Sequence, residues 1–332
     1  MKNVIVVYIL SLFSIELYGQ QIPAKSDILS AYGFVENKIT DQKDEILFYS
    51  YQNGETKKQK LVLYLQGSDP SPLFSYSINE GKLNKYCFLK GDFQALSDEY
   101  LYVAVEKVGF EGLIDENNIP KPKIYQKKNS LDNRVNRAHR TIEYLDSIYN
   151  FSQIIVYGHS EGANVGARLA VECKEITHLG FWAGNVLPDF FDFALEVRKS
   201  YYQGEVSASA AQTRVDEIIA EFTDNIATDT ANVEMEGYTN LRWWSYAEPA
   251  LFNLTQLNIP LYVQVATEDE SAPIESAYVL PLEFARLQKS NLSFNVCVGC
   301  NHSFQKKLKK GKVENKWREI FTNFIKWTQE NP

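Results

Sequence analysis

The sequence predicts an α/β fold with a mostly parallel central sheet flanked by helices. Short, continuous apolar runs recur along the chain, as expected of strands that are buried on both faces. Segments with apolar residues at helical spacing lie between several of these runs. Strands that alternate with helices form a parallel sheet covered on both sides. The 332 residues, 45% of them hydrophobic, suffice for one large domain.

The predicted elements follow in chain order. Residues 46–51 and 60–65 are predicted to be two antiparallel strands joined by an irregular turn at Asn53-Gly54. Further buried strands are predicted at 101–105, 154–157, 179–182, 261–265 and 294–298. Helices are predicted at 131–149, 161–173 and 313–328, where apolar residues share one helical face.

The segment between the predicted strands 179–182 and 261–265 is too long for one crossover. A strand–helix–strand unit takes roughly 30 residues in all. Apolar residues from Val215 to Ile226 recur at helical spacing within the segment. We therefore expect a helical cap insertion at about 185–258, with a structural excursion remote from the site as the alternative.

The N-terminus is predicted to be a signal peptide, residues 1–19. A short positive start precedes an apolar run from Val4 to Phe13, which is too short to span a membrane. Cleavage is expected near Gly19, leaving 20–332 as a single domain in the periplasm or outside the cell. No later apolar run has the length of a membrane span.

The charge of the chain argues against nucleic acid as the main partner. The net charge is −8 at pH 7. Nucleic-acid binding needs clustered Lys and Arg. The one basic cluster, at 306–312, is short and is expected to be a solvated loop.

The residues that carry chemistry begin with Ser160. It lies in Gly158-His159-Ser160-Glu161-Gly162, between a predicted buried strand and a predicted helix. This Gly-x-Ser-x-Gly pattern in that context is typical of a nucleophile elbow. A serine on so sharp a turn takes strained backbone angles, and residues two positions away must be small. Gly158 and Gly162 meet that need, although a tight structural turn would have the same sequence.

A serine hydroxyl is a weak nucleophile and needs a base. His302 follows the last predicted strand across a short loop and is the candidate base. The other histidines are poorly placed. His139 lies in a helix before Ser160, His159 is beside the nucleophile and points elsewhere on an elbow, and His178 precedes a strand at the wrong edge of the sheet.

Together these stretches resemble the α/β-hydrolase superfamily, over roughly residues 45–328. The segments that fall in the family's order and spacing are 61–68, 106–110, 158–162, 267–273 and 301–304. Thr267–Pro273 and His302-Ser303-Phe304 are similar to segments of prolyl-oligopeptidase catalytic domains and of bacterial esterases. Gln66 departs from the histidine usual in the family.

The resemblance implies the remaining catalytic groups. The acid of the triad is expected at Asp269, which precedes a small residue and a proline, with Glu268 as the runner-up. The oxyanion needs two preset donors. They are expected to be the backbone N–H of Glu161, after the nucleophile, and that of Ser68, which follows Gln66-Gly67 in the place of the family's His-Gly motif.

These residues predict a serine hydrolase that cleaves a carboxylic ester or an amide through an acyl-enzyme. The alternatives are a peptidase acting on short peptides and a non-catalytic binding protein on a hydrolase scaffold. Trp243, Trp244 and Tyr246 are candidates for an aromatic substrate pocket or for packing within the cap. Glu161 could bind a substrate ammonium, although a packing role suits it better. The mechanism requires no cofactor and no metal.

Four cysteines leave the redox state open. Cys297 and Cys300 are spaced C-x-x-C, which allows a structural disulfide, two free thiols, or a metal or redox role. Cys87 and Cys173 lie far apart in the sequence.

Overall fold

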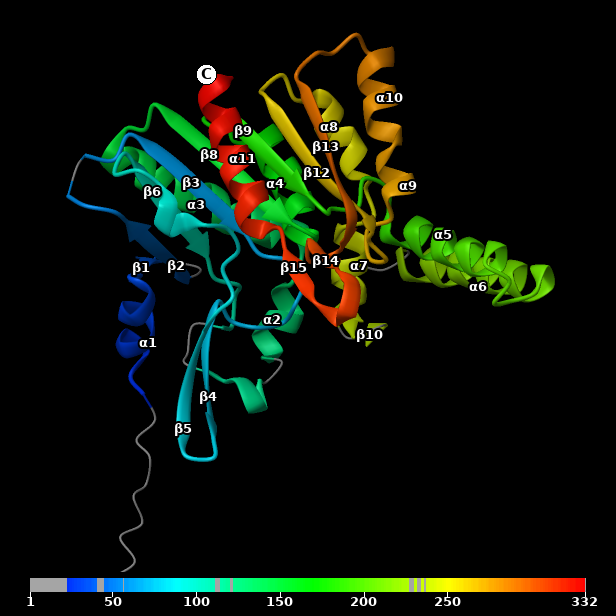
Figure 1. Cartoon of the computed structure of the whole chain (residues 1–332), viewed down its shortest axis with the longest axis horizontal. Helices are drawn as coiled ribbons and strands as arrows, with labels where there is room; N and C mark the ends of the chain where they lie inside the picture. The colour runs from blue at the N-terminus through cyan, green and yellow to red at the C-terminus, as the bar shows by residue number, and fades with distance from the viewer. Residues whose placement is uncertain are drawn as a thin grey trace, which may run out of the picture.

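The computed structural model of the chain describes residues 23–40, 45–55, 57–110, 114–119, 122–226, 230–231, 234–235 and 237–331. The predicted signal peptide, 1–19, lies outside the described residues. A large twisted sheet forms the centre, with helices on both faces (Figure 1). The predicted fold class is thereby confirmed.

The sheet is parallel at its centre and antiparallel at both edges. In spatial order the strands are β1 (Val35–Thr40), β2 (Glu45–Gln52), β6 (Tyr100–Val105), β3 (Lys60–Leu65), β8 (Gln153–His159), β9 (His178–Trp182), β12 (Leu261–Glu268), β13 (Leu292–Asn301), β14 (Gln305–Lys307) and β15 (Val313–Asn315). The neighbours from β6 to β13 in this spatial order run parallel to one another.

The expectation that the first two strands predicted from the sequence form a hairpin is wrong. Strand β6 lies between β2 and β3, paired antiparallel with β2 and parallel with β3. The two predicted strands therefore run in opposite directions without touching. The connection between them is long enough to cross one strand, and β3, which is apolar from Leu61 to Leu65, gains two partners in the buried centre of the sheet.

Two hydrophobic cores lie on opposite faces of the sheet. Leu61, Leu63 and Leu65 of β3 belong to one core, whereas Val62 and Tyr64 belong to the other, because side chains alternate along a strand. Helices α3 (Leu131–Tyr149), α4 (Glu161–Glu172), α8 (Ala250–Gln256) and α10 (Val279–Arg286) complete the first core, and α1 (Lys25–Tyr32) and α11 (Trp317–Glu330) the second.

The segment predicted as a cap contains several helices. Helices α5 (Asp189–Tyr202) and α6 (Ala208–Ile226) lie side by side and project from the body (Figure 1). The small strands β10 (Glu234–Met235) and β11 (Tyr238–Thr239) and helix α7 (Asn240–Ser245) follow. Helix α8 also falls within 185–258, but it packs against α4 in the main core.

The remaining elements are short. Strands β4 (Phe74–Asn79), β5 (Lys82–Cys87) and β7 (Ile114–Asp115) form a separate small sheet. Helices α2 (Lys123–Lys128) and α9 (Ile274–Ala277) and 3-10 turns at Phe93–Ala95, Glu116–Asn118 and Lys309–Gly311 complete the description. Within the described residues, no helix is both long and apolar enough to cross a membrane.

Candidate active site

Ser160 lies on a sharp turn between β8 and α4, as the sequence predicts. Its backbone angles are φ 57° and ψ −131°, a strained conformation for a residue with a side chain. The turn can form only with glycine at both flanks. A Cβ on Gly158 would lie 2.0 Å from the carbonyl oxygen of Gly162, and a Cβ on Gly162 would lie 2.1 Å from that of Leu65. The sequence pattern is thus explained by close contact between backbones.

Asp269 and His302 meet because of an irregularity in the sheet. Ala266 of β12 pairs with Cys297 of β13, but Glu268 pairs with Asn301, so β13 contains two additional residues over this stretch. The next residues along the two strands, Asp269 and His302, are therefore adjacent. Bulges often re-aim side chains next to active sites in this way.

The Asp269 carboxylate is buried and fixed. Its Oδ1 accepts hydrogen bonds from the backbone N–H groups of Ser271 at 2.9 Å and Ala272 at 2.8 Å. The His302 Nδ1 lies 2.9 Å from both carboxylate oxygens. A carboxylate only accepts, so Nδ1 carries the proton and Nε2 is left as an acceptor. Glu268, the runner-up for the acid, is exposed.

Ser160 and His302 line the same cavity, of about 640 Å³. Its wall also contains Gln66, Gly67 and Ser68, the segment expected to supply an oxyanion donor. The structure therefore brings together the three predicted triad residues and the predicted oxyanion loop.

Gly67 lies directly against the nucleophile, so a larger residue there would be crowded. A Cβ added there would be 3.3 Å from the Cβ of Ser160 and 3.7 Å from its Oγ. The loop can therefore place backbone N–H groups close to the serine hydroxyl.

Arg134 of α3 binds two carbonyl groups of the Gln66–Ser68 loop. Its guanidinium donates to the carbonyl oxygen of Gln66 and, at 3.4 Å, to that of Gly67. The N–H of a trans peptide points away from its C=O. Anchoring these carbonyls on Arg134 therefore turns the N–H groups of Gly67 and Ser68 to the opposite side. Arg134 lines neither this cavity nor the second cavity at Ser160, described below.

Glu161, whose backbone N–H is the other expected oxyanion donor, has a buried side chain between two arginines. Its Oε1 lies 2.6 Å from Arg134 and its Oε2 lies 2.8 Å from Arg242 of α7. Burial alone would raise the pKa of this carboxyl, but Arg242 and Arg134 outweigh burial and lower the pKa to about 2. Arg242 also pairs with Asp189 of α5 at 2.8 Å. Glu161 therefore joins the elbow to the insertion.

His159 has no role predicted from the sequence, but in the structure this residue contacts the loop that contains His302. Its ring Nε2 donates to the backbone carbonyl of His302 at 2.8 Å. The ring packs against Trp317 at a centroid distance of 4.9 Å. Burial, and then the neighbouring His302, lower the pKa of His159 to about 3. A neutral ring therefore holds the loop of the candidate base, and no local sequence signal indicates that partner.

A second cavity, of about 290 Å³, adjoins Ser160 on the side of the insertion. Trp243 and Tyr246 line it, as the sequence suggested. Trp244 is 45% exposed and is part of neither wall. Successive residues of a helix point about 100° apart, since one turn takes about 3.6 residues, and Trp244 lies on the side of α7 that is exposed to solvent.

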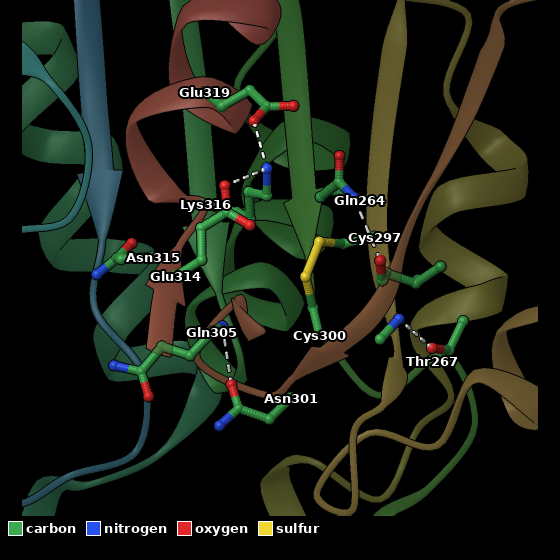
Figure 2. The surroundings of a disulfide bond; sticks show 12 residues. Gln264, Thr267, Cys297, Cys300, Asn301, Gln305, Glu314, Asn315, Lys316 and Glu319 are labelled. Carbon is green, nitrogen blue, oxygen red and sulfur yellow. Dashed lines mark hydrogen bonds and ion pairs between the residues drawn. A yellow bond between two sulfur atoms is a disulfide. The ribbon is translucent and has the colours of Figure 1, made fainter. Parts of the chain in front are cut away.

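Of the alternatives for the C-x-x-C motif, the structure has the disulfide. Cys297 and Cys300 are bonded, with an S–S distance of 1.98 Å. Figure 2 shows the bond in the irregular part of β13, beside Thr267, whose hydroxyl accepts from the Gly299 N–H at 2.8 Å. The disulfide closes the stretch that contains the additional residues and ends two positions before His302.

One group of side chains could hold a metal. Among the described residues, ligand atoms of His139, Cys173 and Glu175 lie within 4.8 Å of one another. Cys173 follows the C-terminal end of α4, whereas Ser160 is at its N-terminal end. This group is therefore separate from the candidate active site.

The chain has an α/β-hydrolase fold. It is similar to the solved structures of Est1E from Butyrivibrio proteoclasticus (10% identity, 89% of this chain and 98% of that chain, TM-score 0.51) and of a Pyrococcus furiosus esterase (14%, 93% and 92%, 0.50). It is also similar to an acylaminoacyl peptidase of Pyrococcus horikoshii (12%, TM-score 0.57), with 89% of this chain spanning 41% of that one. No protein-family model and no curated protein matches the sequence. Likeness at such low identity concerns the fold.

Proposed function

We propose that the protein is a serine hydrolase that cleaves a carboxylic ester through an acyl-enzyme on Ser160. The observation that carries the proposal is the His302–Asp269 pair, because the bond to Asp269 leaves Nε2 as the acceptor and His302 lines the cavity that also contains Ser160. A serine on a strained turn at the start of a helix is the expected partner of such a base.

The proposed reaction has two half-reactions. Ser160 Oγ attacks the ester carbonyl while His302 Nε2 takes its proton, and the N–H groups of Ser68 and Glu161 hold the oxyanion. The tetrahedral intermediate then expels the alcohol, which takes the proton from His302. A water molecule, deprotonated by His302, next attacks the acyl carbon, and Ser160 regains its proton as the acid leaves. Asp269 keeps the imidazole in the required tautomer and stabilises its charged form.

Glu161 is not available to bind the N-terminal ammonium of a peptide substrate. Glu161, the acid closest to the nucleophile along the chain, is engaged by Arg134 and Arg242. It is therefore committed within the protein, and the ammonium-binding role considered for it has no support here. Amide cleavage by the same groups is the alternative that a substrate panel tests.

The experiment combines labelling with a substrate panel. A fluorophosphonate is expected to label the protein at Ser160, located by peptide mass spectrometry, and Ser160→Ala is expected to abolish labelling. Ser147→Ala, at an exposed position of α3, is the matched control. Hydrolysis of 4-nitrophenyl esters but not of aminoacyl or dipeptidyl anilides supports the esterase. Undiminished turnover by purified Ser160→Ala contradicts the mechanism, and an unlabelled Ser160 without turnover favours a binding protein.

We also propose that the chain is exported and cleaved near Gly19. Support comes from the apolar N-terminal run and from the Cys297–Cys300 disulfide, since such bonds persist in oxidising compartments. N-terminal sequencing of the protein from cell envelopes tests the cleavage. A sequence that begins near Gln20 is expected, and an intact Met1 would contradict it.

A further inference from the structure

Four side chains with metal-ligand atoms lie near the end of α4 that is remote from Ser160. His139 and Glu143 belong to α3, Cys173 is the residue that ends α4, and Glu175 is in the turn that follows. Ligand atoms of His139, Cys173 and Glu175 lie within 4.8 Å of one another. Because α4 has 12 residues, it places about 18 Å between this group and the nucleophile, so the group is independent of the proposed function.

Each helix contributes two of the four side chains. His139 and Glu143 are four residues apart, which places them on one face of α3, and Nε2 of His139 lies 3.8 Å from Oε1 of Glu143. The Cys173 thiol donates to Oε2 of Glu175 at 3.3 Å. In a tetrahedral zinc site, bonds of about 2.0–2.3 Å place neighbouring ligand atoms roughly 3.3–3.6 Å apart. Both distances are close to that spacing, and Glu143 and Glu175 are exposed, so their side chains can rotate towards a common centre.

The charge of this group favours a cation. Within the part of the chain that the structure describes, neither Glu143 nor Glu175 forms an ion pair with a lysine or an arginine. The adjacent Lys174 donates instead to the carbonyl oxygen of Val171. Cys173 also stands at the C-terminal end of α4, where the partial negative charge of the helix dipole attracts positive charge. Two carboxylates and a helix C-terminus therefore act together on a cation bound here.

We propose that His139, Cys173 and Glu175 bind a zinc ion, with Glu143 as the fourth ligand. Zinc accepts thiolate, imidazole and carboxylate ligands, and four of them complete a tetrahedral structural site. The thiol hydrogen lies between Sγ of Cys173 and Oε2 of Glu175, so zinc binding releases this proton and joins both atoms to the metal. The ion links α3 to the end of α4 and stabilises the folded chain.

The test is metal binding to the full chain after a chelator has removed bound metal. Calorimetric titration with Zn²⁺ is expected to show one ion per chain and, from buffers of different ionisation enthalpy, the release of about one proton. Titration with Co²⁺ is expected to produce a thiolate-to-cobalt charge-transfer band. Cys173→Ser should remove this band. Cys87→Ser, at the other unpaired cysteine, in β5 of the small sheet, is the matched control and should retain it.

The ligand variants decide the outcome. Even the loss of a group outside the ligand set typically costs about 10- to 100-fold in metal affinity, so His139→Ala and Glu175→Gln should each weaken zinc binding by at least about 10²-fold. Because Glu175 is exposed, Glu175→Gln is expected to fold even if Cys173→Ser, at a buried position, does not. A wild type that binds no zinc, a wild type without the charge-transfer band, or equal zinc affinity in the wild type and Glu175→Gln would overturn the inference.

Discussion

Replacing Asp269 by Asn is expected to reverse the tautomer of His302. Oδ1 of Asp269 already accepts from two backbone N–H groups, those of Ser271 and Ala272. An asparagine must keep its carbonyl oxygen at that position, because its amide nitrogen would face two donors. The amide NH₂ then occupies the place of Oδ2, opposite His302 Nδ1. Although Nδ1 lies 2.9 Å from both oxygens, Oδ1 already accepts from two N–H groups, so the NH₂ group favours an Nδ1 that accepts. The proton then moves to Nε2, which can no longer take the proton of Ser160.

The expected loss is on the order of 10⁴ in kcat, as for the same change in serine protease triads. At about 1.36 kcal/mol per tenfold in rate, this corresponds to roughly 5 kcal/mol of transition-state stabilisation. KM should change little, since the substitution leaves the shape of both cavities intact. Glu268→Gln is the matched control, and because Glu268 is exposed it should stay within about tenfold of wild type.

The assay is steady-state kinetics of both variants on one activated ester, with circular dichroism to show that both are folded. A folded Asp269→Asn variant with more than about a tenth of the wild-type kcat would refute the tautomer argument. A crippled Glu268→Gln variant would instead move the acid to Glu268 and show that the loop is in the wrong register.

Three further predictions follow from the contacts around His302 and the oxyanion loop. His159→Phe removes the 2.8 Å bond to the His302 carbonyl and should lower kcat about three- to tenfold. Because burial and His302 lower the pKa of folded His159 to about 3, the wild type should lose stability as pH falls below the unfolded value of about 6.5 towards 3. The variant should lose less unfolding free energy than the wild type between pH 7 and pH 5. Urea unfolding at both pH values measures this loss, and an equal loss in the two proteins would contradict the prediction. Arg134→Lys, which cannot reach all three of its acceptors, should lower kcat by roughly 10- to 100-fold with little change in KM, whereas a change in KM alone would assign Arg134 to substrate binding. A double Cys297→Ala/Cys300→Ala variant should lose only about 2 kcal/mol of unfolding free energy, since the loop is short, but up to about 10²-fold in kcat through displacement of His302; unaltered kcat would show that the turn holds its shape without the bond.

Local patterns predicted the elements that position the nucleophile. The helix predicted at 131–149 is α3, Leu131–Tyr149, and the strand predicted at 154–157 lies within β8. These elements depend on the spacing of neighbouring apolar residues, which the sequence shows directly. Ser160 was identifiable for the same reason, because the turn requires Gly158 and Gly162 within two positions on either side.

Pairing between distant segments was harder to predict. The insertion of β6 between β2 and β3 depends on which strands share the buried centre of the sheet. Residues 313–315 were expected to begin the last helix, but they form β15, which pairs with β14. In both places a local apolar pattern allows two structures, and contacts remote in sequence decide between them.

The arginine partners of the buried Glu161 carboxylate could not be identified from the sequence. A carboxylate next to the nucleophile would oppose the negative charge that develops on the substrate oxygen, and burial strengthens that repulsion. Because Glu161 is buried, it needs cationic partners if Ser160 is to act. The sequence indicated neither the burial nor the partners, because Arg134 and Arg242 lie 27 and 81 residues from Glu161. Arg134 also bonds the oxyanion loop, and Arg242 belongs to the insertion and lines the second cavity at Ser160. The Glu161 carboxylate therefore links the nucleophile, the oxyanion loop and this cavity through buried ion pairs.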